Sequence, residues 1–216
     1  MRFDLHIHSK YSDGGASVEE IVRVARRKGL GGIAVTDHNT LDGSMAALRI
    51  CRSRYKEMII IRGAEIDTSE GHLIVLGVDE MPEKGLTPEE TIEEAHDLGG
   101  IAVLPHPYHL FRHSIGRIPP VDAVEVCNSK YILGLSNLRA MLEARRRRIP
   151  MVAGSDAHVA ETVGLGVTIL NAASEDDVLD EIRKNRTRID CCRTPFDVVA
   201  KRLAKKIYRK LRHQRV

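Results

Sequence analysis

Short apolar runs alternate with helical patterns along most of the 216-residue chain, and this alternation constrains the fold more than any other feature. Eight runs read as buried strands: 3–7, 32–36, 58–62, 73–76, 101–104, 123–126, 151–153 and 167–170. Repeated strand–helix units are typical of parallel sheets, and seven or eight of them favour a closed or nearly closed barrel. A flat, doubly wound sheet is the alternative. It would place a glycine-rich phosphate loop after the first strand, and residues 9–15 match no such loop.

Helix starts support this reading of the chain. Ser17 and Thr87 each stand three residues before a glutamate, Glu20 and Glu90, which is the spacing of a capping box. Ser174 precedes three acidic residues, as expected for the first turn of a further helix.

Histidines and acids gather where the predicted strands end. In the first strand, His6 and His8 are two residues apart, so both side chains point to the same face. Because active sites lie at the carboxyl ends of the strands in such folds, we expect this polar set to converge. Its other members are Asp13, His38, Glu65, His72, His106, Glu125, Asn128, Asp156 and His158.

Such a set would be costly to bury unless cations lay among its members. Mixed nitrogen and oxygen ligands suit zinc, manganese or iron better than calcium or magnesium. The sequence therefore predicts a centre for divalent metal ions.

The formal net charge of +3 hides a basic end. Residues 193–216 carry a formal charge of +8, so the preceding residues carry −5. Val199, Leu203, Ile207 and Leu211 are spaced as an apolar stripe on a helix. We therefore divide the chain into a barrel, 1–192, and a basic amphipathic C-terminal helix, 193–216. This helix is expected to dock on the barrel, to contact nucleic acid or to lie on an anionic membrane surface.

Four cysteines without a CxxC spacing make disulfides improbable and favour a reducing, cytoplasmic setting. No signal peptide is expected, and no apolar run reaches the roughly 18 residues of a membrane span.

Six segments, taken in order, resemble the motifs of the polymerase and histidinol phosphatase (PHP) family. They are "DLHIHSKYSDG", "AVTDHNT", "GAEI", "LPHP", "VEVCN" and "GSDAH", and they extend from Asp4 to His158. The resemblance implies a distorted (β/α)7 barrel, similar to a TIM barrel, that holds two or three divalent ions.

The resemblance also implies which residues hold each ion. The first ion would have four ligands: His6, His8, Glu65 and Asp156. Glu65 would bridge to a second ion shared with His106 and Asn128. The third ion would be held by Asp13, His38 and His158.

Asn128 departs from the pattern, because the family often has histidine or cysteine at that position. An amide oxygen is a poorer ligand for zinc-like metals, which puts the second site in doubt. Cys127, its neighbour, is a substitute candidate.

Other residues are candidates for contacts with the substrate. His72 is placed to touch substrate or donate a proton, and Arg112 and Arg117 suit phosphate oxygens. His109, His113 and Lys130 are further phosphate candidates. Asp4 is expected either to orient a ligand imidazole or to be a surface or structural acid, and Asp37 to have a structural role.

The resulting hypothesis is a phosphoesterase that uses metal-activated water on nucleotides or short oligonucleotides. Two alternatives remain open: a histidinol-phosphate-type phosphatase of small molecules, and a non-catalytic, metal-stabilised module that binds nucleic acid. An amidohydrolase is a further rival, but the TDH segment, Glu65 and the Asp156–His158 pair speak against it.

Overall fold

The computed structural model describes residues 1–109, 113–130 and 134–195, and within them lie ten strands, five α-helices and one 3₁₀ helix. The strands are β1 (Arg2–Ile7), β2 (Gly32–Val35), β3 (Ile59–Ile61), β4 (Gly63–Asp67), β5 (His72–Leu76), β6 (Ile101–Leu104), β7 (Ala123–Asn128), β8 (Met151–Gly154), β9 (Gly166–Ile169) and β10 (Arg188–Cys191). The helices are α1 (Val18–Arg27), α2 (Asp42–Arg54), α3 (Pro88–Asp97), α4 (Leu135–Arg147), η1 (Ala160–Thr162) and α5 (Glu175–Arg183).

The strands form two five-stranded mixed sheets. The first has the order β10-β9-β1-β2-β3, with β1, β2 and β3 parallel and β9 antiparallel to both of its neighbours. The second has the order β4-β5-β6-β7-β8, with β5 antiparallel to β4 and β6, and with β6, β7 and β8 parallel. The α/β class predicted from the sequence is confirmed.

A closed barrel of parallel strands is not confirmed, because four of the strand pairs are antiparallel. Isolated bridges still link the two sheets, between Ile7 and Ala157 and between His38 and Glu65. The sequence reading also missed two strands. β4 follows β3 after one residue and merged with it in the pattern, while β10 is largely exposed and lacks an apolar run.

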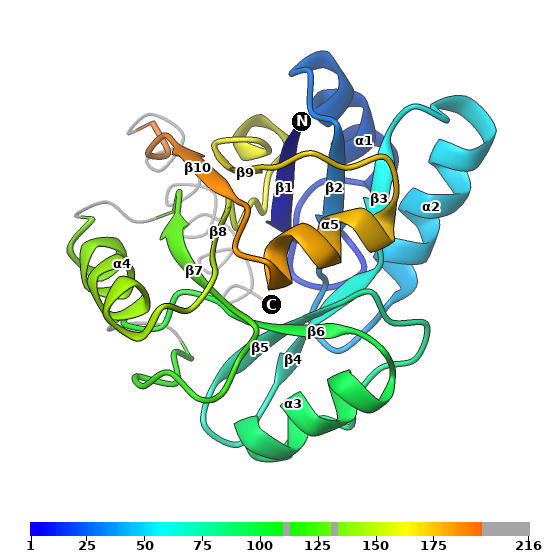
Figure 1. Ribbon diagram of the computed structural model, residues 1–216. Helices are drawn as coiled ribbons and strands as arrows, with labels where there is room; N and C mark the ends of the chain where they lie inside the picture. The colour runs from blue at the N-terminus through cyan, green and yellow to red at the C-terminus, as the bar shows by residue number, and fades with distance from the viewer. Residues whose placement is uncertain (110–112, 131–133, 196–216) are drawn as a thin grey trace, which may run out of the picture.

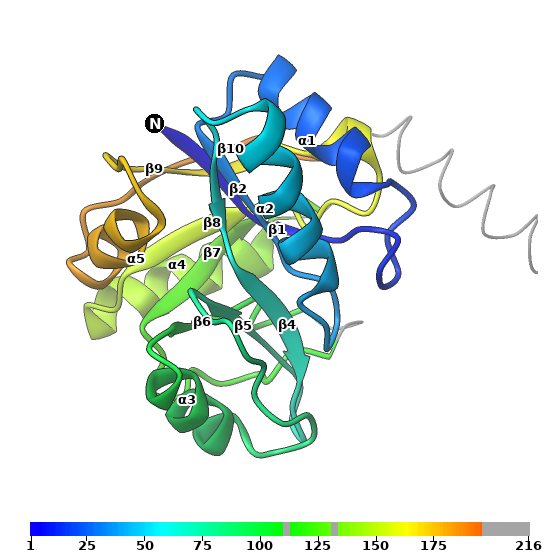
Figure 2. The same cartoon turned by 90° about the vertical axis from the view of Figure 1, so that its right-hand side faces the viewer.

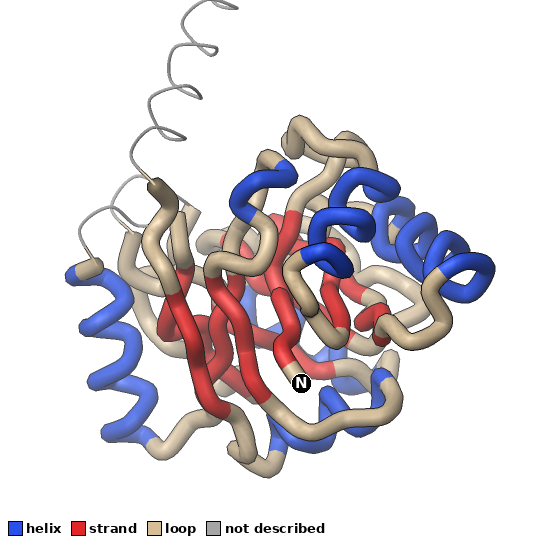
Figure 3. The backbone as a smooth tube through the Cα atoms, turned by 90° about the horizontal axis from the view of Figure 1, so that it is seen from above, coloured by secondary structure: helices blue, strands red, loops and turns tan. Residues whose placement is uncertain are grey.

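Helices surround the strands, as the view from above makes plain (Figure 3). Helices α1 and α2 pack on each other and on β2 and β3, α3 packs on β5 and β6, and α4 packs on β7 (Figures 1 and 2). Three apolar clusters between these layers make up the core. This core leaves one end of the strands to carry polar side chains.

A side-chain cap is present at each of the three predicted helix starts, but only two of the three are complete capping boxes. Thr87 and Glu90 complete a capping box at α3. Ser174 does the same at α5, where Asp177 is the acidic partner. At α1 the side chain of Ser17 accepts a hydrogen bond from the backbone N–H of Glu20. The second bond of a capping box, from the Ser17 backbone N–H to the Glu20 side chain, is not found in this cap.

The expectation that the cysteines stay unpaired is wrong for two of them. Cys127 of β7 and Cys191 of β10 form a disulfide, with Cα atoms 6.4 Å apart. The two strands belong to different sheets, so the pairing depended on a tertiary contact that cysteine spacing does not reveal. Cys51 and Cys192 are free.

None of the helices in the described part of the chain combines the length and hydrophobicity that a membrane crossing requires. The basic helix predicted for 193–216 lies outside the described residues from Phe196 onward.

Candidate metal centre

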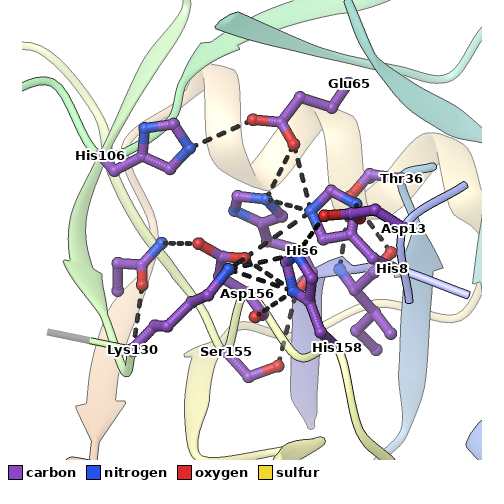
Figure 4. A network of polar contacts seen from close by, with 12 residues as sticks. His6, His8, Asp13, Thr36, Glu65, His106, Lys130, Ser155, Asp156 and His158 are labelled. Atoms are coloured by element: carbon purple, nitrogen blue, oxygen red, sulfur yellow. Dashed lines mark hydrogen bonds and ion pairs between the residues drawn. The ribbon is translucent and has the colours of Figure 1, made fainter. Parts of the chain in front are cut away.

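Four side chains from three separate parts of the fold converge at the polar end of the strands (Figure 4). Nε2 of His6 lies 3.1 Å from Nε2 of His8. Glu65 Oε2 lies 3.4 Å from His6 Nε2 and 3.1 Å from His8 Nε2. Asp156 Oδ1 lies 3.7 Å from His8 Nε2. All four residues are at most 2% exposed, so water has little access to them.

These spacings are those of a set of metal ligands. Donor atoms about 2.0–2.1 Å from one tetrahedral ion lie about 3.3 Å from each other. His6, His8 and Asp156 form one possible ligand group, because their donor atoms lie within 4.8 Å of one another. The first ligand set implied by the sequence is therefore assembled.

The other oxygen of Glu65 faces a second pair of imidazoles. Glu65 Oε1 lies 3.1 Å from Nε2 of His106 and 3.0 Å from Nδ1 of His72. The two oxygens of Glu65 thus face different histidines, and its bridging of two ions stays a prediction. His72, predicted to contact substrate or donate a proton, also forms a possible ligand group with His38 and Glu65.

The third predicted set is also brought together. Asp13 Oδ2 lies 2.8 Å from His158 Nε2, and Asp13 Oδ1 lies 3.5 Å from His8 Nδ1. His8, Asp13 and His38 form another possible ligand group. Asp13 is exposed, so this group opens toward solvent.

Carboxylates behind the histidines hold the rings in place. Glu125 of β7, to which the sequence reading gave no role, lies 3.0 Å from His6 Nδ1 through Oε1, and its Oε2 accepts from the His106 backbone N–H. Asp67 Oδ1 lies 3.1 Å from His38 Nδ1. Such partners fix the orientation of a ligand imidazole. The signal that could have identified these two residues is a carboxylate on the same strand face as a ligand, as Asp67 is to Glu65, or beside one.

Of the two roles expected for Asp4, its contacts support the structural one, and the structural role expected for Asp37 agrees with its contacts. Asp4 touches no ligand ring: its carboxylate accepts from the backbone N–H groups of Ser155 and Gly164, which ties β1 to the segment after β8. Asp37 accepts from Ser9 and Ser12 and so holds the loop after β1.

Backbone conformation contributes to the site as well. His106 and Asp156 have φ angles of 32° and 49°, in a region that residues other than glycine seldom adopt. Such strain is held in place by surrounding contacts and gathers at functional sites. At Gly154 a Cβ atom would lie 2.4 Å from Cβ of His6 and 2.6 Å from Oε1 of Glu125, so glycine permits their close approach.

The carboxylates and imidazoles shift each other's ionisation. Burial lowers the pKa of His8 to about 4, so this ring is neutral at pH 7 and able to bind a metal. Burial alone would lower the pKa of His6, but Glu125, Glu65 and Asp156 outweigh it and raise that pKa well above the ordinary value. Burial likewise opposes the ionised form of Glu65, yet His6 and the hydrogen-bonded histidines hold its pKa well below the ordinary range.

The donor set fits divalent ions on independent grounds. Among the described side chains, Nδ1 of His8 and Nδ1 of His106 are buried without a hydrogen-bond partner. In addition, the adjacent Nε2 atoms of His6 and His8 cannot both carry protons without repulsion. A cation bound between these Nε2 atoms would remove the repulsion, because each ring would then offer it a lone pair instead of a proton.

Several predicted residues have other contacts. Arg117 is exposed, and its guanidinium donates to Glu70 and Glu89, so these contacts do not support a phosphate-binding role. Arg112 lies outside the described residues. Cys127 is unsuited to replace Asn128 as a ligand because its sulfur is bonded to Cys191.

Asn128 itself is buried beside the cluster, but its side-chain nitrogen donates to Glu125 and Asp156. Lys130 extends its Nζ to 2.8 Å from Asp156 Oδ1 and 3.1 Å from His158 Nδ1. His113, another phosphate candidate, stacks on His72 with the ring centroids 5.2 Å apart.

Comparisons with known proteins agree with this geometry. The PHP-associated family model matches residues 134–187. MJ1587, an uncharacterised protein of Methanocaldococcus jannaschii, is 42% identical over 151 residues, which are 63% of this chain and 87% of that protein. A phosphoribosyl 1,2-cyclic phosphate 1,2-diphosphodiesterase of Eggerthella lenta is 31% identical over 100 residues, which are 43% of this chain and 37% of that enzyme.

Among solved structures, a two-domain protein from Bacteroides vulgatus that contains a predicted PHP-like metal-dependent phosphoesterase has a TM-score of 0.72 at 18% identity. The match covers 89% of this chain and 65% of that one. At this identity the likeness concerns the fold.

Proposed function

The chain belongs to the PHP family, and from this premise we propose that it is a metal-dependent phosphoesterase acting on nucleotides or short oligonucleotides. The observation that carries the proposal is the convergence of His6 Nε2, His8 Nε2 and Glu65 Oε2 within 3.4 Å of one another beside Asp156. Manganese, zinc or iron bound in such a centre lowers the pKa of water and stabilises charge on phosphoryl oxygens.

The protein's own groups would then bind and orient. His6, His8, Glu65 and Asp156 would hold one ion, and Glu125 would keep the His6 ring in the orientation that directs Nε2 to it. Asp13, with His38 and His158, would hold another. Because ions held by these residues would supply activated water, hydrolysis would need no protein nucleophile.

His72 is the proposed proton donor to the leaving oxygen. Burial would lower its pKa, but its hydrogen bond to Glu65 and the charges of Glu65 and Asp67 raise it. The ring is partly exposed, with Nδ1 directed to Glu65 and Nε2 3.3 Å from Asp67 Oδ1, so an Nε2 proton would have to turn from this carboxylate to a substrate oxygen.

A cyclic phosphodiester is a second candidate substrate. It is favoured by the match to the Eggerthella lenta diphosphodiesterase, whose name specifies a cyclic phosphate. Histidinol phosphate, as a small phosphomonoester, is a third.

The test is a panel assay of purified, Mn(II)-loaded protein. Nucleoside monophosphates, short oligonucleotides, a ribose cyclic phosphate and histidinol phosphate are compared for phosphate release or ester cleavage, while the bound metal is measured in parallel. Turnover of the nucleotides or oligonucleotides above the other substrates is expected. If none is hydrolysed with metal bound, the reading as a metal-stabilised binding module replaces the phosphoesterase.

We also propose that the basic tail contacts the oligonucleotide. Deleting residues 197–216 is expected to weaken oligonucleotide binding, and to weaken it more at low salt than at high salt, because phosphate contacts are screened by salt. Fluorescence anisotropy at two ionic strengths measures this. Equal affinity of the full and shortened chains would leave the tail as a packing element.

A further inference from the structure

The side chain of Lys130 contacts donors that belong to two different ligand sets (Figure 4). Its Nζ lies 2.8 Å from Asp156 Oδ1, 3.1 Å from His158 Nδ1 and 3.2 Å from His158 Nε2. Asp156 is a member of the first ligand set, and His158 is a member of the third. One ammonium group therefore borders both sets.

The oxygen of Asp156 that contacts Lys130 also faces the first ion position. Asp156 Oδ1 lies 3.7 Å from Nε2 of His8, whereas Oδ2 accepts from the side-chain nitrogen of Asn128 at 3.1 Å. Asp156 is 2% exposed, so its two oxygens have little room to exchange places. An ion bound by the first set would share Oδ1 with the ammonium, and the two positive charges would repel each other.

At His158 the ammonium lies beside the nitrogen that an ion would need. Nδ1 of this ring lies 3.0 Å from the backbone oxygen of Asp156, which can only accept, so Nδ1 carries the hydrogen. In the neutral ring that metal binding requires, the lone pair is then on Nε2. This atom lies 2.8 Å from Asp13 Oδ2, so the ammonium of Lys130 and an ion of the third set would compete for its lone pair.

The backbone of Lys130 is held in place, whereas its side chain has room to turn. The Lys130 backbone N–H donates to Asn128 Oδ1 at 3.1 Å, and the hydroxyl of Ser129 donates to the backbone oxygen of Ser155 at 2.7 Å. The Lys130 side chain is 18% exposed, and its aliphatic stem is flexible. The ammonium can therefore turn toward the open side of the cluster without a shift of the strand end.

From these contacts we infer that Lys130 couples metal binding to substrate binding. Its ammonium competes with the ions for Asp156 and His158, and once the ions are bound it pairs with a phosphoryl oxygen of the substrate. Phosphate esters are anionic, and lysine binds them as a compact point charge. The inference rests on the proposed metal-dependent function and assigns one side chain to both steps.

Metal affinity tests the competition without any activity measurement. Metal-free protein is titrated with Mn(II) in the presence of a chromophoric chelator. Lys130→Met keeps a long side chain but removes its charge, so this variant is expected to bind Mn(II) about 10-fold more tightly than the wild-type chain. Lys184→Met is the matched control, because it removes a lysine that pairs with Asp180 outside the cluster, and it should bind Mn(II) as the wild-type chain does.

Phosphate affinity tests the second partner. Inorganic phosphate is titrated into the Mn(II)-loaded protein by isothermal titration calorimetry. Lys130→Met is expected to bind phosphate about 10-fold more weakly than the wild-type chain, because a charged hydrogen bond is lost. Lys130→Arg keeps the charge and should bind within about 3-fold of the wild-type chain, and Lys184→Met should be unchanged.

Circular dichroism reports folding of each variant, and Lys130→Gln replaces Lys130→Met if the latter folds poorly. Equal or weaker Mn(II) binding by the uncharged variant would overturn the inference, as would phosphate binding equal to that of the wild-type chain. A wild-type chain that binds Mn(II) and phosphate with the expected differences but hydrolyses no ester would end the phosphoesterase proposal alone. A wild-type chain that binds no Mn(II) would overturn both.

Discussion

At the scale of single residues, His8 has the most contacts with other candidate ligands. Its Nε2 faces His6 and Glu65, and its Nδ1 lies 3.5 Å from Asp13, so it borders both proposed ion positions. Removing it should therefore disturb both.

We expect His8→Ala to lose at least one ion per chain and to lower turnover by at least about 100-fold, while the fold persists. The ring contributes ligand atoms, and the apolar face of β1 that builds the core is unchanged. Elemental analysis, circular dichroism and the panel assay measure these effects. His96→Ala, on an exposed residue of α3, is the control, and unchanged metal content in His8→Ala would contradict the assignment.

Glu125 acts at the same scale through other residues. It contacts His6 Nδ1, the His106 backbone and the Asn128 amide, and is 2% exposed. Glutamine at position 125 would turn its own N–H groups toward the donors from which Glu125 accepts. It would therefore not hold His6 in the tautomer that a metal ligand requires.

We therefore expect Glu125→Gln to weaken metal binding by about 10–100-fold with little change in overall fold. Competition with a chromophoric chelator gives the affinity. Glu57→Gln, on an exposed residue, should bind as the wild-type chain does. Equal affinities for the two variants would reduce Glu125 to a packing role.

At the scale of elements, α3 is the helix whose start the sequence specified most fully. Thr87 Oγ1 accepts from the Glu90 backbone N–H at 3.3 Å, and Glu90 Oε2 accepts from the Thr87 backbone N–H at 2.8 Å. Both bonds satisfy groups that a helix N-terminus otherwise leaves unpaired.

Thr87→Ala is expected to lower the free energy of unfolding by about 1 kcal/mol, and hence the Tm by roughly 2–4 °C. Hydrogen bonds from Thr87 lower the pKa of Glu90, so the cap stabilises the fold above the ordinary glutamate pKa and this contribution is lost as the pH falls through the lowered value. The difference from wild type should therefore be larger at pH 7 than at pH 3. Thermal melts at both pH values check this, and a loss of equal size at both would count against an ionised Glu90 in the cap. Ser53→Ala, late in α2, should not lower the Tm.

At the scale of the whole molecule, the Cys127–Cys191 disulfide joins the two sheets. Cys127 lies on β7 of one sheet and Cys191 on β10 of the other, 64 residues apart in sequence. A bond that closes a loop of this length restricts the unfolded chain.

Cys191→Ser is accordingly expected to lower the free energy of unfolding by about 2–4 kcal/mol, as measured by urea unfolding without reductant. Cys192→Ser, which changes the adjacent free and exposed cysteine, should leave it unchanged. In the denatured but unreduced wild-type protein, a thiol reagent should find two free thiols. Four would mean that the bond does not form.

Local patterns were enough for the features that depend on neighbours in sequence. Apolar runs identified eight strands, and side-chain and acid spacing identified the starts of α1, α3 and α5 but not those of α2 and α4. The two-residue step from His6 to His8 placed both rings on one face. The strand-end position of Glu65, His106 and Asp156 placed them near that pair, as the structure confirms.

Other features depend on contacts between segments that are far apart in the sequence. The directions of β5, β9 and β10, the disulfide, the amide orientation of Asn128 and the attachment of Asp4 to Ser155 and Gly164 all depend on partners far along the chain. Periodicity reports which face of a segment is buried, but it carries no information about which segment covers that face or in which direction it runs. By itself, therefore, the sequence determined which side chains could form a metal centre, and the tertiary structure decided which of their atoms lie close enough together to share an ion.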